Sequence, residues 1–289
     1  MHPHLLALTA ILETGSFEAA AHHLGITSSA VSQRIRALED RVGGPVLSRM
    51  SPITATALGA RVAVHASDMA RLDEELLEQL GESSRLSVAV AVNADSLATW
   101  FLPALAGHER RLFRILVEDQ DHSADLLRRG EVAAAVTSRA ETTQGADCIA
   151  LGRLRYVATA SPEFVSRYFD NGLTAEAFAR APALVFNAKD GLQTEWASAR
   201  VGKRLTLPSH YLPSTRGFVE AAILGIGWGM NPEPLVSQDL AEGRLVALDP
   251  TAPLDTPLYW QSSRVGAKAL RSLTISVRHA ASAMLYPLD

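Results

Sequence analysis

The sequence predicts two architectures in one chain: an N-terminal all-α winged helix-turn-helix with a long linker helix, and a C-terminal α/β domain of two lobes. Three observations lead to this prediction. Residues 15–42 read as two short helices joined by a tight turn. Residues 57–80 carry apolar side chains at alternating steps of four and three. From residue 86 onward, short apolar runs alternate with helical segments, as is typical of α/β domains.

The first helix of the N-terminal pair is expected to begin at Phe17. Ser16 is a good N-cap because its hydroxyl accepts a backbone N–H that the helix leaves unpaired. Gly25 ends the helix, where the chain needs a residue that tolerates positive φ. Thr27 or Ser28 is then expected to cap the next helix.

The second helix of the pair is amphipathic. Its buried stripe comprises Val31, Ile35, Leu38 and Val42. Its opposite face carries small or polar residues: Ser28, Ser29, Ser32, Gln33 and Arg36. Such a face suits a helix in the major groove of DNA, where amide and guanidinium groups read base edges. The alternative is an ordinary helical hairpin whose polar face is solvated.

The residues around this pair carry a family resemblance. The run ETGSFEAAAHHLGITSSAVSQRIRALEDRVGGPVLSR closely resembles the winged helix-turn-helix of LysR-type transcriptional regulators, through GSF, A-A-x-x-L, A-V-S-Q-x-I-x-x-L-E and G-x-x-L-x-R. The family's L-T-x-x-G motif is matched at Thr56 and Gly59, but Ala55 stands where the family has leucine. A short two-stranded wing is expected over 46–54, with Arg49 and Thr56 beside the phosphates. The predicted DNA-contacting residues are Ser16, Thr27, Ser28, Ser29, Ser32, Gln33, Arg34, Arg36, Arg49 and Thr56.

Composition limits the function classes. The 289 residues carry a net charge of −4, and residues 1–60 are neutral apart from histidine, so one module is expected to bind DNA modestly and two are needed. No apolar run is long enough to span a membrane, and no signal peptide is recognisable. The single cysteine, Cys148, excludes a disulfide within the chain and fits a reducing cytoplasm, where we expect the protein.

The linker helix predicts an oligomer. Its apolar seam has one polar member, His65, and consists of Leu58, Val62, His65, Met69, Leu72 and Leu76. A lone helix cannot bury such a seam, so it packs either on its own domain or on a second copy, and the LysR resemblance favours a dimer or tetramer. The predicted domains are 1–58 (winged helix-turn-helix), 59–84 (linker helix) and 85–289 (effector domain).

The C-terminal domain is expected to resemble a periplasmic-binding-protein fold. Continuous apolar strands are predicted at 86–92, 115–118, 132–137 and 183–186. Lobe I is assigned to about 85–140 and 264–289, and lobe II to about 141–263, with crossovers near 138–150 and 260–265. Asp95 or Ser96 is expected to cap the helix after the first strand, and Ser214 the helix before Gly225.

Polar residues gather where ligands bind in open α/β sheets, beyond the carboxyl ends of strands. The helix N-termini at 93–96 and 213–215 suit an anion such as an α-carboxylate, although their serines alone would merely cap the helices. Acidic residues follow two strands and suit an ammonium or guanidinium, unless they form a solvated acidic turn: Glu118, Asp119, Asp121 and Asp190.

The segments NADSLATWFLPAL, VED at 117–119 and ALVFNAKD at 183–190 resemble the arginine- and lysine-responsive branch of the LysR family, which controls basic amino-acid export and related genes. The resemblance implies a regulator that binds double-stranded DNA and a basic amino acid, with RNA polymerase as a further partner and neither cofactor nor metal. The predicted effector-binding residues are Asn93, Asp95, Ser96, Thr99, Trp100, Glu118, Asp119, Asp121, Asn187, Asp190, Ser214 and Thr215.

Two other functions stay open on the residues. One is an amino-acid-processing enzyme with a fused helical module, although the chain lacks GxSxG, P-loop and HExxH motifs and a cysteine pair. The other is a binding module that acts through a protein partner without DNA. Turnover of lysine or arginine would identify the first, and failure to shift upstream DNA the second.

Overall fold

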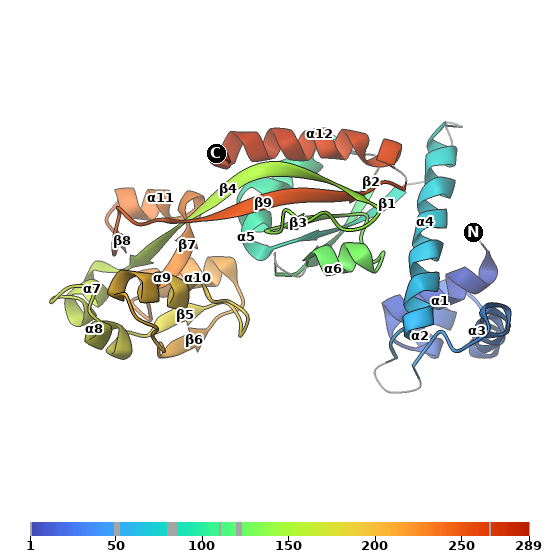
Figure 1. The fold of residues 1–289 in the computed structure, drawn as a ribbon, viewed down its shortest axis with the longest axis horizontal. Coiled ribbons are helices and arrows are strands. Elements are labelled where there is room, and N and C mark those ends of the chain that lie inside the picture. The colour runs from blue at the N-terminus through green and yellow to red at the C-terminus, as the bar shows by residue number, and fades with distance from the viewer. Residues whose placement is uncertain are drawn as a thin grey trace.

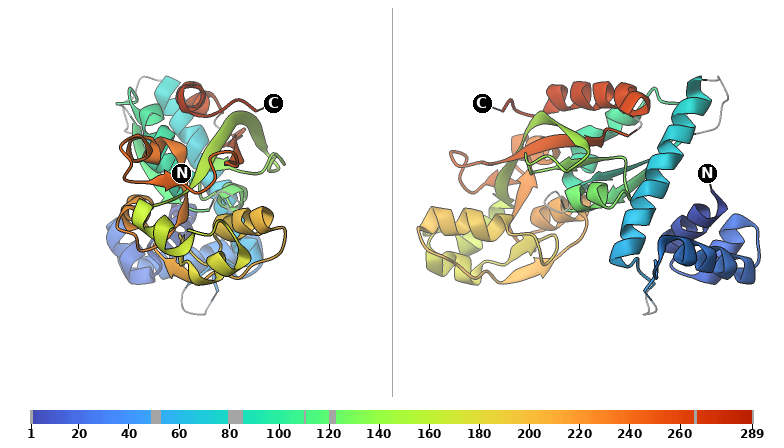
Figure 2. Two further views of the ribbon diagram at one scale, coloured as in Figure 1. Left: turned by 90° about the vertical axis from the view of Figure 1, so that its left-hand side faces the viewer. Right: turned by 45° about the vertical axis from the view of Figure 1, so that its right-hand side comes forward.

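The computed structural model places a helical N-terminal domain, a long helix and a two-lobed α/β domain along one axis (Figure 1). The long helix α4 stands between the helical domain and the α/β domain (Figure 2, right). The residues that the structure describes are 2–48, 53–79, 86–109, 111–119, 123–265 and 267–288.

The N-terminal helices form as their capping residues predict. They are α1 (Pro3–Thr14), α2 (Phe17–Leu24) and α3 (Ser28–Val42). The hydroxyl of Ser16 accepts from the N–H of Ala19, and that of Thr27 accepts from the N–H of Ala30. Gly25 has φ +65°, the left-handed conformation expected at the end of α2. The sequence prediction of a helix-turn-helix is therefore confirmed.

The predicted wing is present where the chain is described. Leu47 and Ala55 form an antiparallel bridge, and the N–H of Ser48 donates to the carbonyl of Thr54 at 2.7 Å. Gly59 lies where a Cβ would fall 1.7 Å from the carbonyl oxygen of Val46, so only glycine allows the wing to meet the following helix. The predicted turn at 51–52 and Arg49 lie outside the described residues.

The apolar side chains of helix α4 (Ala57–Gln79) lie in two different environments. Ala66 is fully buried in the N-terminal core, and Val62 and Met69 pack partly against the same core. Leu72 and Leu76 are 53% and 54% exposed. The first half of the helix thus packs on its own domain, and the second half presents its leucines to solvent.

The α/β domain is built on one mixed sheet with strand order β2-β1-β3-β9-β4-β7, with β8 paired to β4. Strands β1, β2 and β3 are parallel, and β9, β4 and β7 follow with antiparallel pairings. A separate parallel pair joins β5 to β6. The strands are β1 (Leu86–Val92), β2 (Arg111–Val117), β3 (Ala134–Thr137), β4 (Ala146–Ala160), β5 (Ala183–Val185), β6 (Ser209–Tyr211), β7 (Gly229–Pro232), β8 (Val246–Ala247) and β9 (Leu254–Ser263).

Strands β4 and β9 join the two lobes. They pair antiparallel from Ala146 and Ser263 to Tyr156 and Leu254, so they run from one lobe into the other (Figure 1). The predicted crossovers near 138–150 and 260–265 are wrong in extent, because both connections are long strands. The first part of β4 is largely half-exposed or exposed, and so it lacks the continuous apolar run by which the other strands were recognised.

Lobe I packs helices on both faces of β1–β3. Helix α12 lies along one face and α6 on the other (Figure 1). The aromatic core on the α12 side includes Trp100, Phe101 and Trp260, all at most 1% exposed. The helical segments are α5 (Ala94–Ser96), the π-helical turn η1 (Leu97–Phe101), the 3₁₀ turn η2 (Leu102–Leu105), α6 (Ser123–Arg128) and α12 (Ala267–Met284).

Lobe II packs around aromatic residues that continue the same hydrophobic core. The ring of Phe178 lies 5.2 Å from that of Trp228 and 6.2 Å from that of Trp196, centroid to centroid. Its helices are α7 (Pro162–Tyr168), α8 (Ala175–Arg180), α9 (Leu192–Val201), α10 (Thr215–Ile223) and α11 (Glu233–Ala241). Within the described part of the chain, no helix is both long and apolar enough to cross a membrane.

Candidate DNA surface and effector cleft

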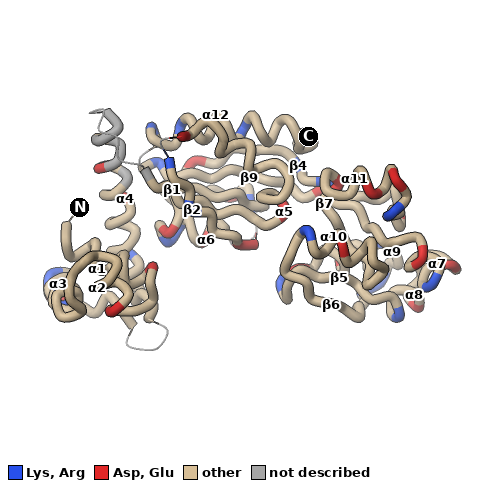
Figure 3. The backbone as a smooth tube through the Cα atoms, turned by 180° about the vertical axis from the view of Figure 1, so that it is seen from behind, with Lys and Arg blue, Asp and Glu red and all other residues tan. Residues whose placement is uncertain are grey.

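The exposed face of α3 carries the residues that the sequence assigns to DNA. Val31, Ile35 and Leu38 are buried on the opposite side. Gln33 and Arg36 are exposed, and Arg34 is half-buried. Figure 3 shows basic positions on α3, at the end of the molecule remote from lobe II. A well-capped helix therefore presents an amide and a guanidinium outward without covering them.

Four of the predicted DNA contacts have hydroxyls that are already engaged, one of them Ser29, whose hydroxyl lies 2.9 Å from that of Thr27. Ser16 and Thr27 cap their helices. The hydroxyl of Thr56 donates to the carbonyl of Pro45 at 2.7 Å and accepts from the N–H of Gly59 at 3.0 Å. Thr56 thus connects the wing to α4 through its hydroxyl, and its contact with a phosphate stays a prediction.

A cavity of about 610 Å³ lies between the two lobes. Its floor is formed where the parallel strands β1 and β2 end side by side, because Val92 is in register with Val117. The segments 93–95 and 117–119 line it from lobe I, and 186–192 and Thr215 line it from lobe II. The carboxyl ends of β1 and β2, where the sequence predicts a site, therefore meet at this cavity.

Asp95 lies deep in this cavity and joins three elements. Its Oδ2 accepts from the Tyr156 hydroxyl at 2.7 Å, and its Oδ1 accepts from the Thr215 hydroxyl at 3.3 Å. Burial raises the pKa of the Asp95 carboxyl, and the two hydrogen bonds oppose that rise. Burial and the neighbouring Asp95 raise the pKa of Tyr156 well above its usual value. A cation beside Asp95 would relieve the cost of its buried charge.

The helix after β1 begins earlier than the sequence suggested. Asn93 is at the N-cap position, so neither Asp95 nor Ser96 caps the helix. The three predicted residues that follow in this segment each have a place other than the cavity lining. Ser96 is fully buried, Thr99 donates to the carbonyl of Asp95 at 2.6 Å, and Trp100 is a core residue. These three do not line the cavity, so their assignment to the effector stays a sequence prediction without support from the cavity lining.

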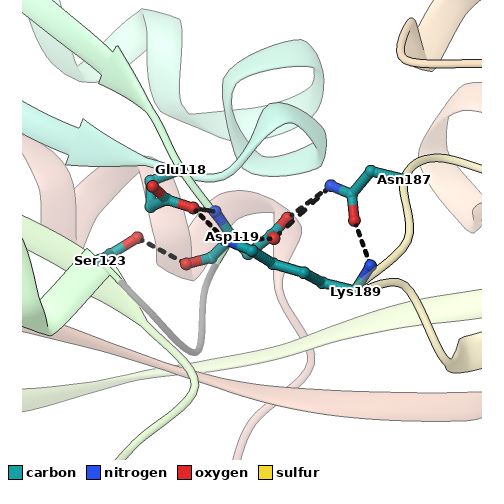
Figure 4. Close-up of polar contacts among 5 residues, drawn as sticks. All are labelled: Glu118, Asp119, Ser123, Asn187 and Lys189. Carbon is teal, nitrogen blue, oxygen red and sulfur yellow. Dashed lines mark hydrogen bonds and ion pairs between the residues drawn. The ribbon is translucent and has the colours of Figure 1, made fainter. Parts of the chain in front are cut away.

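A polar cluster connects the lobes at the cavity mouth (Figure 4). The Nζ of Lys189 lies 3.3 Å from Oε1 of Glu118 and 3.7 Å from Oδ2 of Asp119. The side-chain amide of Asn187 donates to Oδ1 of Asp119 at 3.1 Å. The hydroxyl of Ser123 donates to the carbonyl of Asp119 at 3.1 Å. Both acids of lobe I are therefore bound by side chains of lobe II.

Asp190 organises the loop that supplies these side chains. Its Oδ2 accepts from the N–H of Phe186 at 2.9 Å, and its Oδ1 accepts from the N–H of Leu192 at 3.1 Å. Both carboxylate oxygens are used within the loop, so Asp190 holds the loop in shape although it lines the cavity. Ser214 caps α10 through the N–H of Gly217 and does not line the cavity. Asp121 lies outside the described residues.

Sequence reasoning missed several cavity residues. Tyr156 lies within an apolar strand segment, where no binding residue is expected. Lys189 directly precedes Asp190, which is assigned to the effector in its place. Among the described residues that line the cavity, five are acidic and Lys189 is the one base: Asp95, Glu118, Asp119, Asp190, Glu195 and Lys189. The excess of carboxylates favours a cationic ligand. The segment NAKD contains a signal for Lys189, since a lysine next to the acids of a predicted cleft is unusual.

Comparison with known proteins matches both parts of the chain to one family. Residues 3–60 match the family described as bacterial regulatory helix-turn-helix protein, lysR family, and residues 79–282 match the LysR substrate binding domain. The chain is 42% identical over 291 residues to the lysine export transcriptional regulatory protein LysG of Corynebacterium efficiens, covering 99% of each chain. No helix-turn-helix residue or cavity residue is assigned by these matches; they concern whole domains.

Solved structures extend the comparison. The crystal structure of ArgP from Mycobacterium tuberculosis superposes with a TM-score of 0.87 at 42% identity, covering 99% of both chains. The full-length LysG from Corynebacterium glutamicum, determined with the bound effector Arg, has a TM-score of 0.77 at 37% identity, covering 99% of this chain and 100% of that one. The fold and its two-lobed arrangement are thus shared over the full length.

Proposed function

Because this chain belongs to the LysR family of transcriptional regulators, we propose that it controls transcription in response to a basic amino acid bound between its lobes. The observation that carries the proposal is the acidic character of the cavity. Among the described residues, its lining contains five carboxyl groups and one lysine. Lysine and arginine carry two positive groups and one negative group, so they match such a cavity better than neutral amino acids do. The arginine-bound relative supports the same class of ligand.

The ligand is proposed to lie across the cavity. Asp95 receives the α-ammonium, because its buried carboxylate gains a charge partner there. Glu118 and Asp119 receive the distal ammonium or guanidinium. The α-carboxylate faces the N-terminus of α10 at Thr215, where backbone N–H groups and the helix dipole favour an anion.

The DNA-binding unit is proposed to be an oligomer of this chain, dimer or tetramer, that binds double-stranded DNA in the cytoplasm and contacts RNA polymerase. The exposed Leu72 and Leu76 of α4 support an oligomer, since a second copy would bury them. We keep 1–58, 59–84 and 85–289 as the proposed DNA-binding, linker and effector domains. The named relatives are regulators, which sets aside the alternative of an amino-acid-processing enzyme.

Signal transfer is proposed to follow the connection between lobe I and the linker. A Cβ on Gly130, next to β3, would lie 3.0 Å from Cα of Val64, so α4 packs directly on lobe I. Arg114 of β2 lies 3.7 Å from Glu13 of α1, which connects lobe I to the helical domain. A ligand that favours one arrangement of the lobes would shift the population of subunit arrangements on DNA.

Calorimetry tests the proposed effector. L-lysine and L-arginine are titrated into the full chain beside their neutral counterparts norleucine and citrulline. We expect one site per chain and clear preference for the basic ligands. The double variant E118Q/D119N should lose this preference, because no carboxylate then pairs with the distal cation. Failure of both basic amino acids to bind, or unchanged preference in the variant, would refute the basic-effector proposal.

A further inference from the structure

Lys189 supplies the cavity with a cation that belongs to the chain itself. Its Nζ lies 3.3 Å from Glu118 and 3.7 Å from Asp119, the two acids that the proposed function assigns to the distal cation of the ligand. The ammonium of Lys189 and that of free lysine are the same chemical group. Figure 4 shows the side chain extending from the lobe II loop to the acids of lobe I.

The loop holds this lysine in position. The side-chain oxygen of Asn187 accepts from the backbone N–H of Lys189 at 2.7 Å, and its amide donates to Asp119 at 3.1 Å. Asp190 closes the same loop through the N–H groups of Phe186 and Leu192. The backbone under Lys189 is thus fixed at both sides, whereas its side chain is free to swing because 54% of it is exposed.

An independent feature of the cavity also indicates a ligand. Asn231 lines the cavity and is only 1% exposed. Its amide nitrogen donates to the Thr159 hydroxyl at 2.9 Å, but its Oδ1 has no hydrogen-bond donor among the described residues. A buried acceptor without a donor is costly in a folded protein. An amino-acid ammonium is a donor of the required kind.

We propose that Lys189 is an internal competitor of the effector, occupying the acidic subsite that receives the distal cation of the ligand. The inference rests on the proposed function, because it assumes that a basic amino acid binds here. When the ligand arrives, its cation replaces the Lys189 ammonium on Glu118 and Asp119, and the lysine side chain moves to solvent. Lys189 thereby sets the concentration of basic amino acid at which the cleft responds.

The energetics suit an exchange rather than a fixed structural pair. Glu118 and Asp119 are 33% and 31% exposed, and ion pairs of such exposure contribute little to stability. A ligand cation can therefore replace Lys189 at small cost. A neutral ligand cannot replace it, because it offers the two carboxylates no charge. The competitor consequently lowers the affinity for basic amino acids while it leaves the affinity for neutral ones unchanged, so the concentration of basic amino acid needed for a response is higher.

The opposite role, in which Lys189 binds the ligand carboxylate, fits the contacts less well. The Lys189 ammonium would have to leave both acids to face a carboxylate. Glu118 and Asp119 would then lie in the cavity without the base that now accompanies them. The two roles predict opposite effects of removing the ammonium, so one measurement separates them.

The test compares K189M with the charge-retaining control K189R by calorimetry, using L-lysine and neutral L-norleucine. We expect K189M to bind lysine up to about fivefold tighter, the factor that corresponds to loss of an ion pair at the upper end of the exposed range. Norleucine affinity should change less than about twofold, because norleucine does not compete for the acids. K189R should show no gain for lysine, since a guanidinium still occupies the subsite.

Two outcomes overturn the inference. If the parent binds lysine and K189M binds it equally or more weakly, Lys189 is no competitor, although the proposed effector stands. If neither protein binds lysine or arginine, the proposed function fails and the inference fails with it. A third measurement locates the effect: in the E118Q/D119N background the added K189M change should give no gain, and a full gain there would contradict displacement from these acids.

Discussion

The recognition helix and the effector cleft present their polar groups in different ways. On α3, Gln33 and Arg36 project from a helix that is capped by Thr27 and packed through its other face. In the cleft, Asp95 is bound by Tyr156 and Thr215 from two other elements. Gln33 and Arg36 therefore have no side-chain hydrogen bond or ion pair with the described residues to break before they bind DNA. The cleft exchanges internal partners for ligand groups, which makes its affinity adjustable by residues that never touch the ligand.

Helix α4 connects these two regions, and breaking its outer half should have the largest effect. Replacement of Leu72 by aspartate places an unpaired charge in the proposed interface between copies, so we expect the oligomer to dissociate and DNA affinity to fall sharply. Leu72 is 53% exposed within the chain, so the monomer should remain folded. Sedimentation measures the result, with circular dichroism as the folding control. An unchanged oligomer would place the contact elsewhere.

The difference between the regions also explains what sequence could foresee. The caps at Ser16 and Thr27 and the turn at Gly25 depend on neighbours within a few residues, so the motif predicts them. Asp95 depends on Tyr156 and Thr215, which are 61 and 120 residues away in the chain. Such contacts are decided by topology, which a local pattern does not contain.

One helix boundary in the cleft differs from the sequence prediction. The helix after β1 was expected to begin at Asp95 or Ser96, but Asn93 is its N-cap. Trp100, for which the sequence left open a place in the cleft wall or in the core, lies in the core. Acidic residues after β2 were located correctly, because the end of a strand is a robust signal. Their partner Lys189 was missed, since a single lysine in a loop is ordinarily solvated.

The next largest effect is expected in the cleft, at Asp95. Replacement of Asp95 by asparagine keeps the shape and an acceptor for Tyr156 but removes the charge that pairs with the α-ammonium. Loss of a buried charge partner costs about 2–5 kcal/mol. We expect lysine, arginine and norleucine to weaken alike, measured by calorimetry. A loss confined to the basic ligands would assign Asp95 to the distal cation instead.

Asp95 also gives the cleft a dependence on pH. Burial raises its folded-state pKa above that of the unfolded chain, so its stabilising contribution is full below the unfolded pKa and declines as pH rises through the folded pKa. Binding of an ammonium requires the ionised form. Ligand affinity should therefore fall as pH decreases through the raised pKa of Asp95. Over the same range the free energy of unfolding should increase. D95N should show neither trend, and calorimetry and urea unfolding over the same pH series check both.

The exposed α3 surface predicts a smaller effect of a different kind. Replacement of Gln33 by alanine should weaken specific binding by about 1–3 kcal/mol and relax preference at one base pair. Replacement of Arg49, which the sequence assigns to the phosphates, should instead weaken binding to all sequences and reduce the salt dependence. Gel shifts on operator and random DNA at two salt concentrations separate the two. Equal loss on random DNA in both variants would contradict base reading by Gln33.

The smallest expected effect lies in the strands that join the lobes. Arg155 on β4 donates from Nε and from its terminal nitrogen to the two carboxylate oxygens of Asp255 on β9, at 2.8 and 2.9 Å. This hydrogen bonding lowers the pKa of Asp255 below its usual range. The pair therefore stabilises the fold above the unfolded pKa, and the contribution is lost as pH falls through the lowered folded pKa. Replacement of Asp255 by asparagine should cost about 1–2 kcal/mol of the free energy of unfolding at neutral pH.

Urea unfolding at neutral and acidic pH checks this value, and the gap between parent and D255N should narrow as the pH falls. The matched control is Glu163, which pairs with Arg167 on α7 but is 81% exposed. E163Q should leave unfolding nearly unchanged, because solvent screens so exposed a pair. If the difference in the free energy of unfolding between parent and D255N persists at acidic pH, the charge of Asp255 does not cause the loss of stability. A lysine affinity that stays at the parent value would further show that the strands between the lobes tolerate the change without altering the cleft.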